Sequence, residues 1–276
     1  MPIRNAIPDL NRKLQFFPSQ NKTPKKLSEE QVQQYNREGY ICPLDVFSTG
    51  EINLHRTYFD QLIYKAMKAG WNSYSINGWQ AKCVGIYDLV NEPRILDYVQ
   101  DLIGENLICW ATHYFCKLPG DTKRVSWHQD ASYWPLSPSK TVTVWLAIDD
   151  ADVENGAMQI IPRSHKHGQI DFEESKAEEQ NVLNQTVKEP TSYGLPPVAL
   201  EMKAGQISLH SDLLLHGSEP NTSDRRRCGL TMRFIPPEVR ALNRRNQNSI
   251  IARGIDPDNH WFAASRPEFD QIPSIN

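Results

Sequence analysis

The stretch NLICWATHYFCK, residues 106–117, begins a series of short runs rich in β-branched and aromatic residues. Five further runs of this kind follow, at 141–148, 157–161, 197–202, 206–210 and 229–235. Asn155-Gly156, a dipeptide typical of tight turns, separates two of them. Many short strands without helices between them predict a mainly β protein with an antiparallel sandwich or barrel at its centre.

Helical patterns precede this region. Ser28 and Gln31 form a capping-box pattern for a helix that we expect to run to about residue 37. Apolar residues recur with helical spacing over 50–69, and again over Pro93–Ile103, where proline occupies the first turn and glycine follows the last. The sequence therefore predicts flanking helices first and a double-sheet β-core after them.

The segments outside these elements are polar. Residues 1–26 are expected to form an arm that drapes over the body, and residues 165–195 interrupt the strands as a long insertion or lid. The chain shows no internal repeat and no low-complexity tract. We predict one domain over 1–276, a length sufficient for a core that needs no disulfides.

Composition excludes some functions. Charged residues make up 23% of the chain and the net charge is −3, so no charge pattern favours nucleic acid or an anionic membrane. No apolar stretch approaches the roughly 18–20 residues needed to span a bilayer. The five cysteines are odd in number and lack CxxC spacing, which predicts reduced thiols in a cytoplasmic protein.

A candidate metal site lies between aromatic residues in the stretch SWHQDASYWP, residues 126–135. His128 and Asp130 lie two residues apart, so a strand and the turn after it can present both on one side. Iron(II) sites for oxygen chemistry commonly use two histidines and one carboxylate, with the other positions open. The third ligand should come from a distant strand, for which His210 and His216 compete. His210 also belongs to a second His-x-Asp pair, with Asp212.

Of the two candidates, His216 is favoured by its surroundings. Arg227 follows it by eleven residues and opens the strand at 229–235. Arginine can bind a carboxylate through two parallel hydrogen bonds, which lysine does less well. His165 and His167 suggest a second metal site, but a polar loop after a strand is the simpler interpretation.

Several segments together resemble the phytanoyl-CoA dioxygenase family of iron(II)/2-oxoglutarate-dependent oxygenases. They are WHQD at 127–130, TVWLAIDDADVENGAMQIIPRSHKHG at 143–168, HGSEPNTSDRRR at 216–227, and LSEEQVQQYNREGYI at 27–41, which is similar to the opening helix of that family. The resemblance covers most of residues 27–236. It implies a double-stranded β-helix, a cupin-like jelly-roll core with helices packed outside.

The resemblance also implies roles for individual residues. His128, Asp130 and His216 correspond to the iron ligands of the family, and Arg227 and Ser218 to residues that bind the distal carboxylate of 2-oxoglutarate.

Four further positions are assigned to the cosubstrate with less support. Trp145 matches a position beside 2-oxoglutarate, and His113 a position near its oxo-acid end, although His113 can equally be a core histidine. Gln129, between the two ligands, is typical of the family and is grouped with them. Lys82 aligns with a lysine that reaches the cosubstrate, with a solvated surface lysine as the alternative.

The implied activity is hydroxylation of an unactivated carbon in a small or medium-sized organic substrate, coupled to decarboxylation of 2-oxoglutarate to succinate and carbon dioxide. Iron(II), 2-oxoglutarate and dioxygen are the implied cofactors. Asp130 stands where related iron halogenases have a small residue, which favours hydroxylation over halogenation. Desaturation, epoxidation, cyclisation, or a non-catalytic sensor that binds iron and 2-oxoglutarate remain alternatives.

Three residues are candidates for contact with the substrate. Tyr133 and Trp134 follow the metal motif and either line a pocket or wedge the sheets apart. Arg233, in the strand that begins near Arg227, can point inward as a partner for a substrate carboxylate. The expected partner is a small molecule, with no nucleic acid and no membrane, and no pattern determines the substrate or the oligomeric state.

Overall fold

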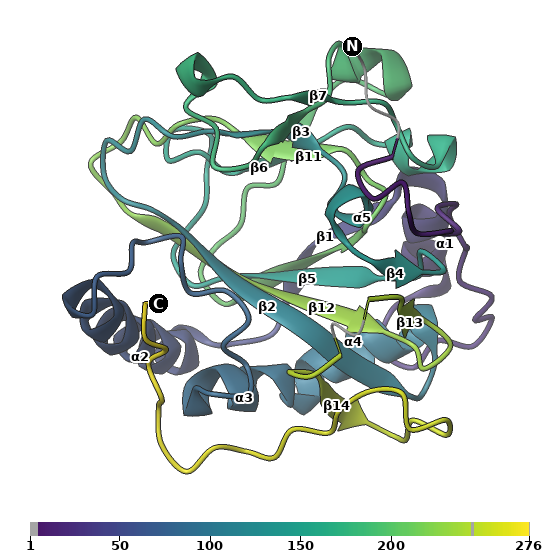
Figure 1. Ribbon diagram of the computed structural model, residues 1–276, viewed down its shortest axis with the longest axis horizontal. Coiled ribbons are helices and arrows are strands. Elements are labelled where there is room, and N and C mark those ends of the chain that lie inside the picture. Colours follow the sequence, from purple (N-terminus) through teal and green to yellow (C-terminus); the bar gives the residue numbers. More distant parts are fainter. Residues whose placement is uncertain (1–4, 244–245, 276) are drawn as a thin grey trace.

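A computed structural model describes residues 5–243 and 246–275 of the 276-residue chain. A six-stranded antiparallel sheet runs through its centre (Figure 1). In spatial order its strands are β1 (Tyr40–Asp45), β10 (Gln206–Ser211), β5 (Val142–Ala147), β12 (Arg227–Ile235), β2 (Leu107–Lys117) and β14 (Ile250–Arg253).

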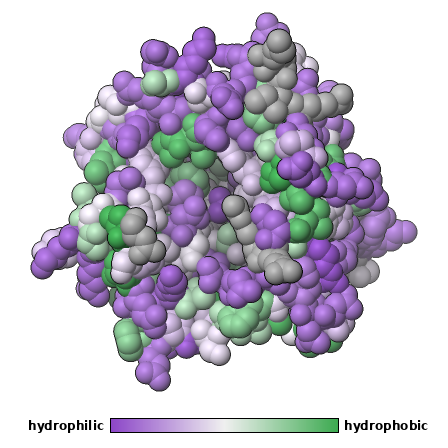
Figure 2. Space-filling model, viewed as in Figure 1, coloured by the Kyte–Doolittle hydropathy of each residue, from purple (hydrophilic) through white to green (hydrophobic). Residues whose placement is uncertain are grey.

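A smaller antiparallel sheet faces it and lies above it in Figure 1. Its order is β3 (Val125–His128), β11 (His216–Ser218), β6 (Met158–Ile160) and β9 (Val198–Ala199). Two ribbons complete the strands: β4 (Leu136–Ser137) with β13 (Arg240–Ala241), and β7 (Glu173–Glu174) with β8 (Gln185–Thr186). These facing sheets form the expected jelly roll. In the same view the surface is hollowed near its centre (Figure 2).

Three of the helices end where the sequence predicts. They are α1 (Glu29–Glu38), α2 (Thr49–Lys68) and α4 (Pro93–Ile103). Ser28 caps α1 by accepting a hydrogen bond from the Gln31 amide, while the Gln31 side chain accepts one from the Ser28 amide. Gly39 ends α1 with a φ of 89°, a left-handed conformation that suits glycine.

Two helices were not predicted. The helix α3 (Val84–Val90) has only seven residues and lacks a side-chain cap at Cys83, so it carries few of the usual start signals. The helix α5 (Asp130–Tyr133) is a single turn directly after β3. Short 3-10 turns span Ser164–His167, Ala177–Glu179 and Pro190–Tyr193.

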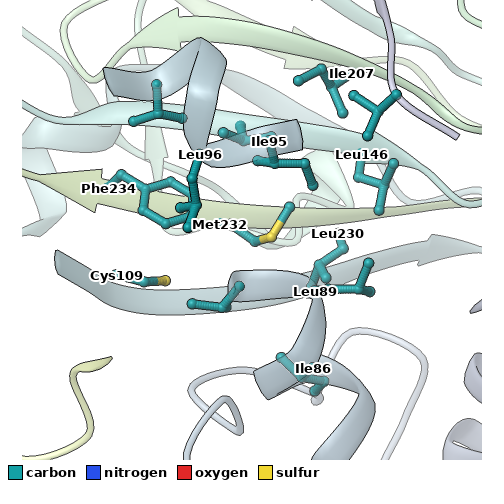
Figure 3. Packing of buried hydrophobic residues seen from close by; sticks show 14 of the residues in the cluster. Ile86, Leu89, Ile95, Leu96, Cys109, Leu146, Ile207, Leu230, Met232 and Phe234 are labelled. Atoms are coloured by element: carbon teal, nitrogen blue, oxygen red, sulfur yellow. The ribbon is translucent and has the colours of Figure 1, made fainter. Parts of the chain in front are cut away.

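The main hydrophobic core lies between the helices and one face of the six-stranded sheet. Leu230, Met232 and Phe234 of β12 point toward Leu89 of α3 and Leu96 of α4 (Figure 3). Residues two apart on a strand share a face, so the odd-numbered positions of β12 from 227 to 233 face the opposite way, toward the smaller sheet. The helices thus bury one side of the sheet and leave the other for the site.

The predicted strands are present, but one turn has a different role from the one its sequence suggests. Asn155-Gly156 does form a turn, in which the Gly156 amide donates to the Val153 carbonyl and Gly156 has a φ of 77°. The turn carries the chain from β5 in one sheet to β6 in the other, so the two strands do not form a hairpin.

The five cysteines are free, as predicted. Within the described residues, no helix has both the length and the apolar character needed to cross a membrane.

Two polar segments, the N-terminal one and residues 165–195, pack against the metal motif. Arg12, in the extended N-terminal segment, donates hydrogen bonds of 2.8 Å to the carbonyls of Ala131 and Trp134. The 165–195 segment runs beside β3, where the Val187 amide donates to the Trp127 carbonyl.

Candidate metal centre and adjoining cavities

His128, Asp130 and His216 converge between the two sheets. One potential ligand atom from each lies within 4.8 Å of the others, and all three residues are buried. β3 and β11 are antiparallel neighbours, and His216 is paired in register with His128. Asp130 follows β3 at the start of α5, which turns its carboxylate back toward the histidines.

Backbone carbonyls fix the orientation of both imidazoles. His128 Nδ1 lies 2.8 Å from the carbonyl of Ser126, and His216 Nδ1 lies 3.0 Å from the carbonyl of Leu214. Because a carbonyl only accepts, each Nδ1 carries the proton and each Nε2 has a free lone pair. This arrangement is typical of histidines that bind metals through Nε2.

The electrostatics of the site suit a divalent cation. Burial alone would raise the pKa of Asp130, but the charge of Arg233 and the contacts with His128 and His216 hold it well below its usual range. Burial lowers the pKa of His216 well below its ordinary value, so its imidazole is neutral. Thr143 donates a 3.3 Å hydrogen bond to Asp130 Oδ2. Two imidazoles and one carboxylate are the donor set expected for iron(II).

A small cavity of about 40 Å³ adjoins the triad and ends at Arg227. The Arg227 guanidinium is buried and bonds to the carbonyl of Gly156 through Nε (3.1 Å) and Nη2 (2.8 Å). Nη2 also lies 3.4 Å from Ser218 Oγ. In the described part of the chain no carboxylate forms an ion pair with Arg227, so its charge is left for a bound anion.

Trp145 lines the same cavity and contacts Arg227, with the guanidinium carbon 5.8 Å from the ring centroid. Its ring lies over Gly229, where an added Cβ atom would overlap the indole. Gly229 on β12 therefore leaves the space that the Trp145 ring, on the neighbouring strand β5, occupies. Arg227, Ser218 and Trp145 come together as the resemblance implies.

A larger cavity of about 640 Å³ opens on the other side of the triad. His128 and Asp130 line both cavities, as do Phe115 and Arg233. Tyr133 and Trp134 form part of the wall of the larger cavity, and Trp134 packs edge-to-face on Trp110 with centroids 5.2 Å apart. The two aromatic residues after the metal motif are therefore lining residues.

His113 lines the larger cavity and not the smaller one. Its Nε2 lies 2.7 Å from the carbonyl of Tyr74. Burial, with the charge of Arg233, lowers its pKa to about 3, so the ring is neutral. The structure therefore places His113 on the side of the triad away from Arg227.

The structure places the Gln129 side chain outside the small cavity. Its Nε2 donates to the carbonyls of Gly168 (2.8 Å) and Leu213 (2.6 Å), and its Oε1 accepts from the Ile170 amide at 2.7 Å. Because alternate residues of an extended segment point to opposite sides, the residue between two inward ligands points away from them. Gln129 instead fastens the start of the 165–195 segment to the loop before β11.

The structure does not bring Lys82 to the triad either. Lys82 lines neither cavity. It lies two residues before α3, and that helix packs on the face of the six-stranded sheet opposite the triad. Gln80, two residues earlier, does line the larger cavity.

The competing histidines have other surroundings. His210 lies on β10 in the larger sheet, with its ring 4.9 Å from that of His216, and lines the small cavity. His165 packs on Phe16, and its Nε2 is 3.3 Å from the carbonyl of Asn36. Of the described residues, only the triad forms a group of three able to hold a metal.

Sequence reasoning missed several lining residues. Phe115 and Thr231 could have been found, since each lies two positions along a strand from a residue already proposed, His113 and Arg233 respectively. The remaining lining residues were not singled out. They are Tyr74, Val125, Met158 and Gly217 in the small cavity, and Asn77, Gly78, Gln80, Trp110, Ala111, Leu183, Gln247 and Asn248 in the larger one.

Comparison with known proteins agrees with this geometry. A model of the family "Phytanoyl-CoA dioxygenase (PhyH)" matches residues 35–229, more than half of the chain. The chain is 25% identical over 241 residues to a probable phytanoyl-CoA dioxygenase of Caenorhabditis elegans, covering 77% of each protein. It is 30% identical over 157 residues to a probable alpha-ketoglutarate-dependent hypophosphite dioxygenase of Stutzerimonas stutzeri, covering 56% of this chain and 54% of that protein. The structure of CytC3 with Fe(II) and alpha-ketoglutarate shares the fold, with a TM-score of 0.64 at 20% identity over 90% of this chain and 98% of the other.

A jelly roll that encloses a buried His-Asp-His triad beside an unpaired buried arginine defines the class of iron(II)- and 2-oxoglutarate-dependent oxygenases. Within that class, the chain belongs to the phytanoyl-CoA dioxygenase family. It is a 2-oxoglutarate-dependent dioxygenase whose cofactors are iron(II), 2-oxoglutarate and dioxygen.

Proposed function

We propose that this dioxygenase hydroxylates an unactivated carbon of a small or medium-sized organic molecule, with His128, Asp130 and His216 holding the iron(II). When bound, the iron, 2-oxoglutarate and dioxygen supply the oxidising power, and 2-oxoglutarate leaves as succinate and carbon dioxide. The observation that carries the proposal is the position of the triad between two cavities, one closed by an unpaired arginine and one lined by aromatic residues. The carboxylate of Asp130 occupies the ligand position that a halide would need, which favours oxygen transfer.

The small cavity is the proposed 2-oxoglutarate site. Arg227 would bind the distal carboxylate, with Ser218 Oγ as a second donor and the Trp145 ring as a wall. Charge-assisted hydrogen bonds to a buried guanidinium are strong because little water competes for them. A dicarboxylate fits this environment, since one end can meet Arg227 while the oxo-acid end reaches the cation held by the triad.

The larger cavity is the proposed substrate site, with Tyr133, Trp134 and His113 in its wall. Leu183 brings the 165–195 segment to the same cavity, and we propose that this segment acts as a lid that limits access of water. The segment is anchored at its start by Gln129 and along β3 by backbone hydrogen bonds.

We further propose that residues 1–276 act as one domain in the cytoplasm. The N-terminal segment bonds to the residues that follow Asp130, so it is part of the support of the site. The five free cysteines support this proposal, because thiols stay reduced in the cytoplasm.

The test is anaerobic reconstitution with iron(II) and labelled 2-oxoglutarate, followed by exposure to air with a panel of organic substrates. Succinate formation should depend on a substrate and should disappear in Asp130→Ala, while His167→Ala, an exposed histidine, retains it. Product mass distinguishes hydroxylation, which adds one oxygen atom, from desaturation or cyclisation. Tight binding of iron and 2-oxoglutarate without turnover on any substrate would support a sensor instead.

A further inference from the structure

A second buried arginine faces the metal site. Arg233 lies six residues after Arg227 on β12, on the same face of the strand, and its residue surface is 7% exposed. The Arg233 Nε atom is buried and has no hydrogen-bond partner in the described part of the chain. A buried donor left unpaired costs free energy, so a bound partner would remove that cost.

Among the described residues, this guanidinium has one long ion pair and no side-chain hydrogen bond. The nearest carboxylate oxygen is Asp130 Oδ2, 4.0 Å from Nε, which is too long for a hydrogen bond and belongs to the proposed metal ligand set. Trp134 packs on the guanidinium, with 5.0 Å from the guanidinium carbon to the ring centroid. This stacking holds the plane of Arg233 in place and leaves its N–H groups for a ligand.

The rest of the larger cavity favours the same kind of ligand. Trp110 Nε1 is a second buried donor without a partner among the described residues. Asp130 is the one carboxylate among the described lining residues. Apart from Arg233, the other polar side chains of the wall are amides, histidines, tryptophans and the Tyr133 phenol. Arg233 and Trp110 thus offer two buried N–H donors without a partner among the described residues, next to a single carboxylate.

We propose that Arg233 binds an anionic group of the substrate, so that the enzyme acts on organic acids whose carboxylate or equivalent oxyanion meets Arg233. This inference rests on the proposed function and adds the chemical class of the substrate. Arg227 and Arg233 then serve two different anions, the cosubstrate in the small cavity and the substrate in the larger one. The acid group at Arg233 places the remainder of the molecule along Tyr133 and Trp134.

The test uses matched probes on the protein loaded with iron(II) and 2-oxoglutarate under anaerobic conditions. Hexanoate, 3-phenylpropanoate and indole-3-acetate are each compared with the corresponding primary amide by calorimetric titration. At least one acid should bind about ten-fold more tightly than its amide, as expected for one charge-assisted hydrogen-bonded contact. Arg233→Gln should bring that ratio close to one, and Arg233→Lys should retain part of it.

Two controls separate this role from others. Arg163→Gln, which removes an exposed arginine paired with Glu38, should leave the ratio unchanged. The affinity of Arg233→Gln for 2-oxoglutarate should stay within about two-fold of the wild type, because Arg227 remains.

Equal binding of acids and amides by the wild type would overturn the proposal. So would an Arg233→Gln protein that keeps the preference but loses 2-oxoglutarate or iron, because Arg233 would then serve the cosubstrate or Asp130. In both cases wild-type succinate formation would leave the proposed function intact. Failure of the wild type to bind iron and 2-oxoglutarate would overturn both.

Discussion

His128 and His216 are register partners on adjacent antiparallel strands, and their ring centroids lie 4.1 Å apart. The strand pairing itself therefore brings together two ligands that are 88 positions apart in the sequence. Asp130 completes the triad from the first turn of α5, and its carboxylate is held by Thr143.

The Thr143 hydroxyl should tune metal affinity. Thr143→Val removes the 3.3 Å hydrogen bond to Asp130 Oδ2 while keeping the shape of the side chain. We expect iron(II) affinity to fall by about ten-fold, since partners of ligating carboxylates contribute roughly 10–100-fold. Anaerobic metal titration checks this, with Thr57→Val, on the exposed side of α2, as the control. Unchanged affinity would mean that the Thr143 hydroxyl does not support Asp130 as a metal ligand.

Arg227 should control the affinity for 2-oxoglutarate. Arg227→Gln removes the buried charge, and we expect the KM for 2-oxoglutarate to rise by about 100-fold, because losing one partner of a buried charge pair costs roughly 2–5 kcal/mol. Arg227→Lys should recover little, since Nε and Nη2 both bond to Gly156 and a lysine cannot reproduce that fork. Steady-state kinetics measure both variants. The neighbouring Arg225→Gln, at an exposed ion pair with Asp152, should leave this KM unaltered.

Gln129 should contribute to stability and not to cosubstrate binding. Gln129→Leu leaves the carbonyls of Gly168 and Leu213 and the amide of Ile170 without their partner. The expected loss is about 2–4 kcal/mol in the free energy of unfolding, from denaturant titration. Affinity for 2-oxoglutarate should remain within about two-fold. Gln33→Leu, at an exposed position of α1, is the matched control, and a stable Gln129 variant that loses 2-oxoglutarate would contradict the structural role.

His165 should make stability depend on pH. Burial lowers its pKa to about 4 in the folded protein, whereas an unfolded histidine titrates near about 6.5. As pH falls below about 6.5 the unfolded chain takes up the proton first, so stability is lost between about pH 6.5 and 4, by roughly 3 kcal/mol. His165→Gln should show a smaller loss over this window. Urea unfolding at pH 7.5, 5.5 and 4.5 measures the difference, and parallel curves for the two proteins would rule the effect out.

Local signals in the sequence predicted the helices that begin with a capping residue or a proline. The capping box at Ser28 and the first-turn proline of α4 specify helix starts with few neighbours involved. The three-residue strand β11 has no such signal, because His216, Gly217 and Ser218 follow no apolar alternation. Its pairing with β3 and β6 makes it a strand.

Within the site, the sequence alone determined which residue types were present and which residues of a strand share a face. The surroundings of His216 favoured it over His210, and the tertiary structure supplies the physical reason: β10 and β11 belong to different sheets, and β11 alone is the neighbour of β3. For Arg233, only the tertiary structure decides which way the side chain points. All nine residues of β12 are buried, so burial does not reveal which face looks toward the helices and which toward the metal. That choice is made by long-range strand pairing and by the helices that cover one side of the sheet, neither of which is encoded within the strand itself.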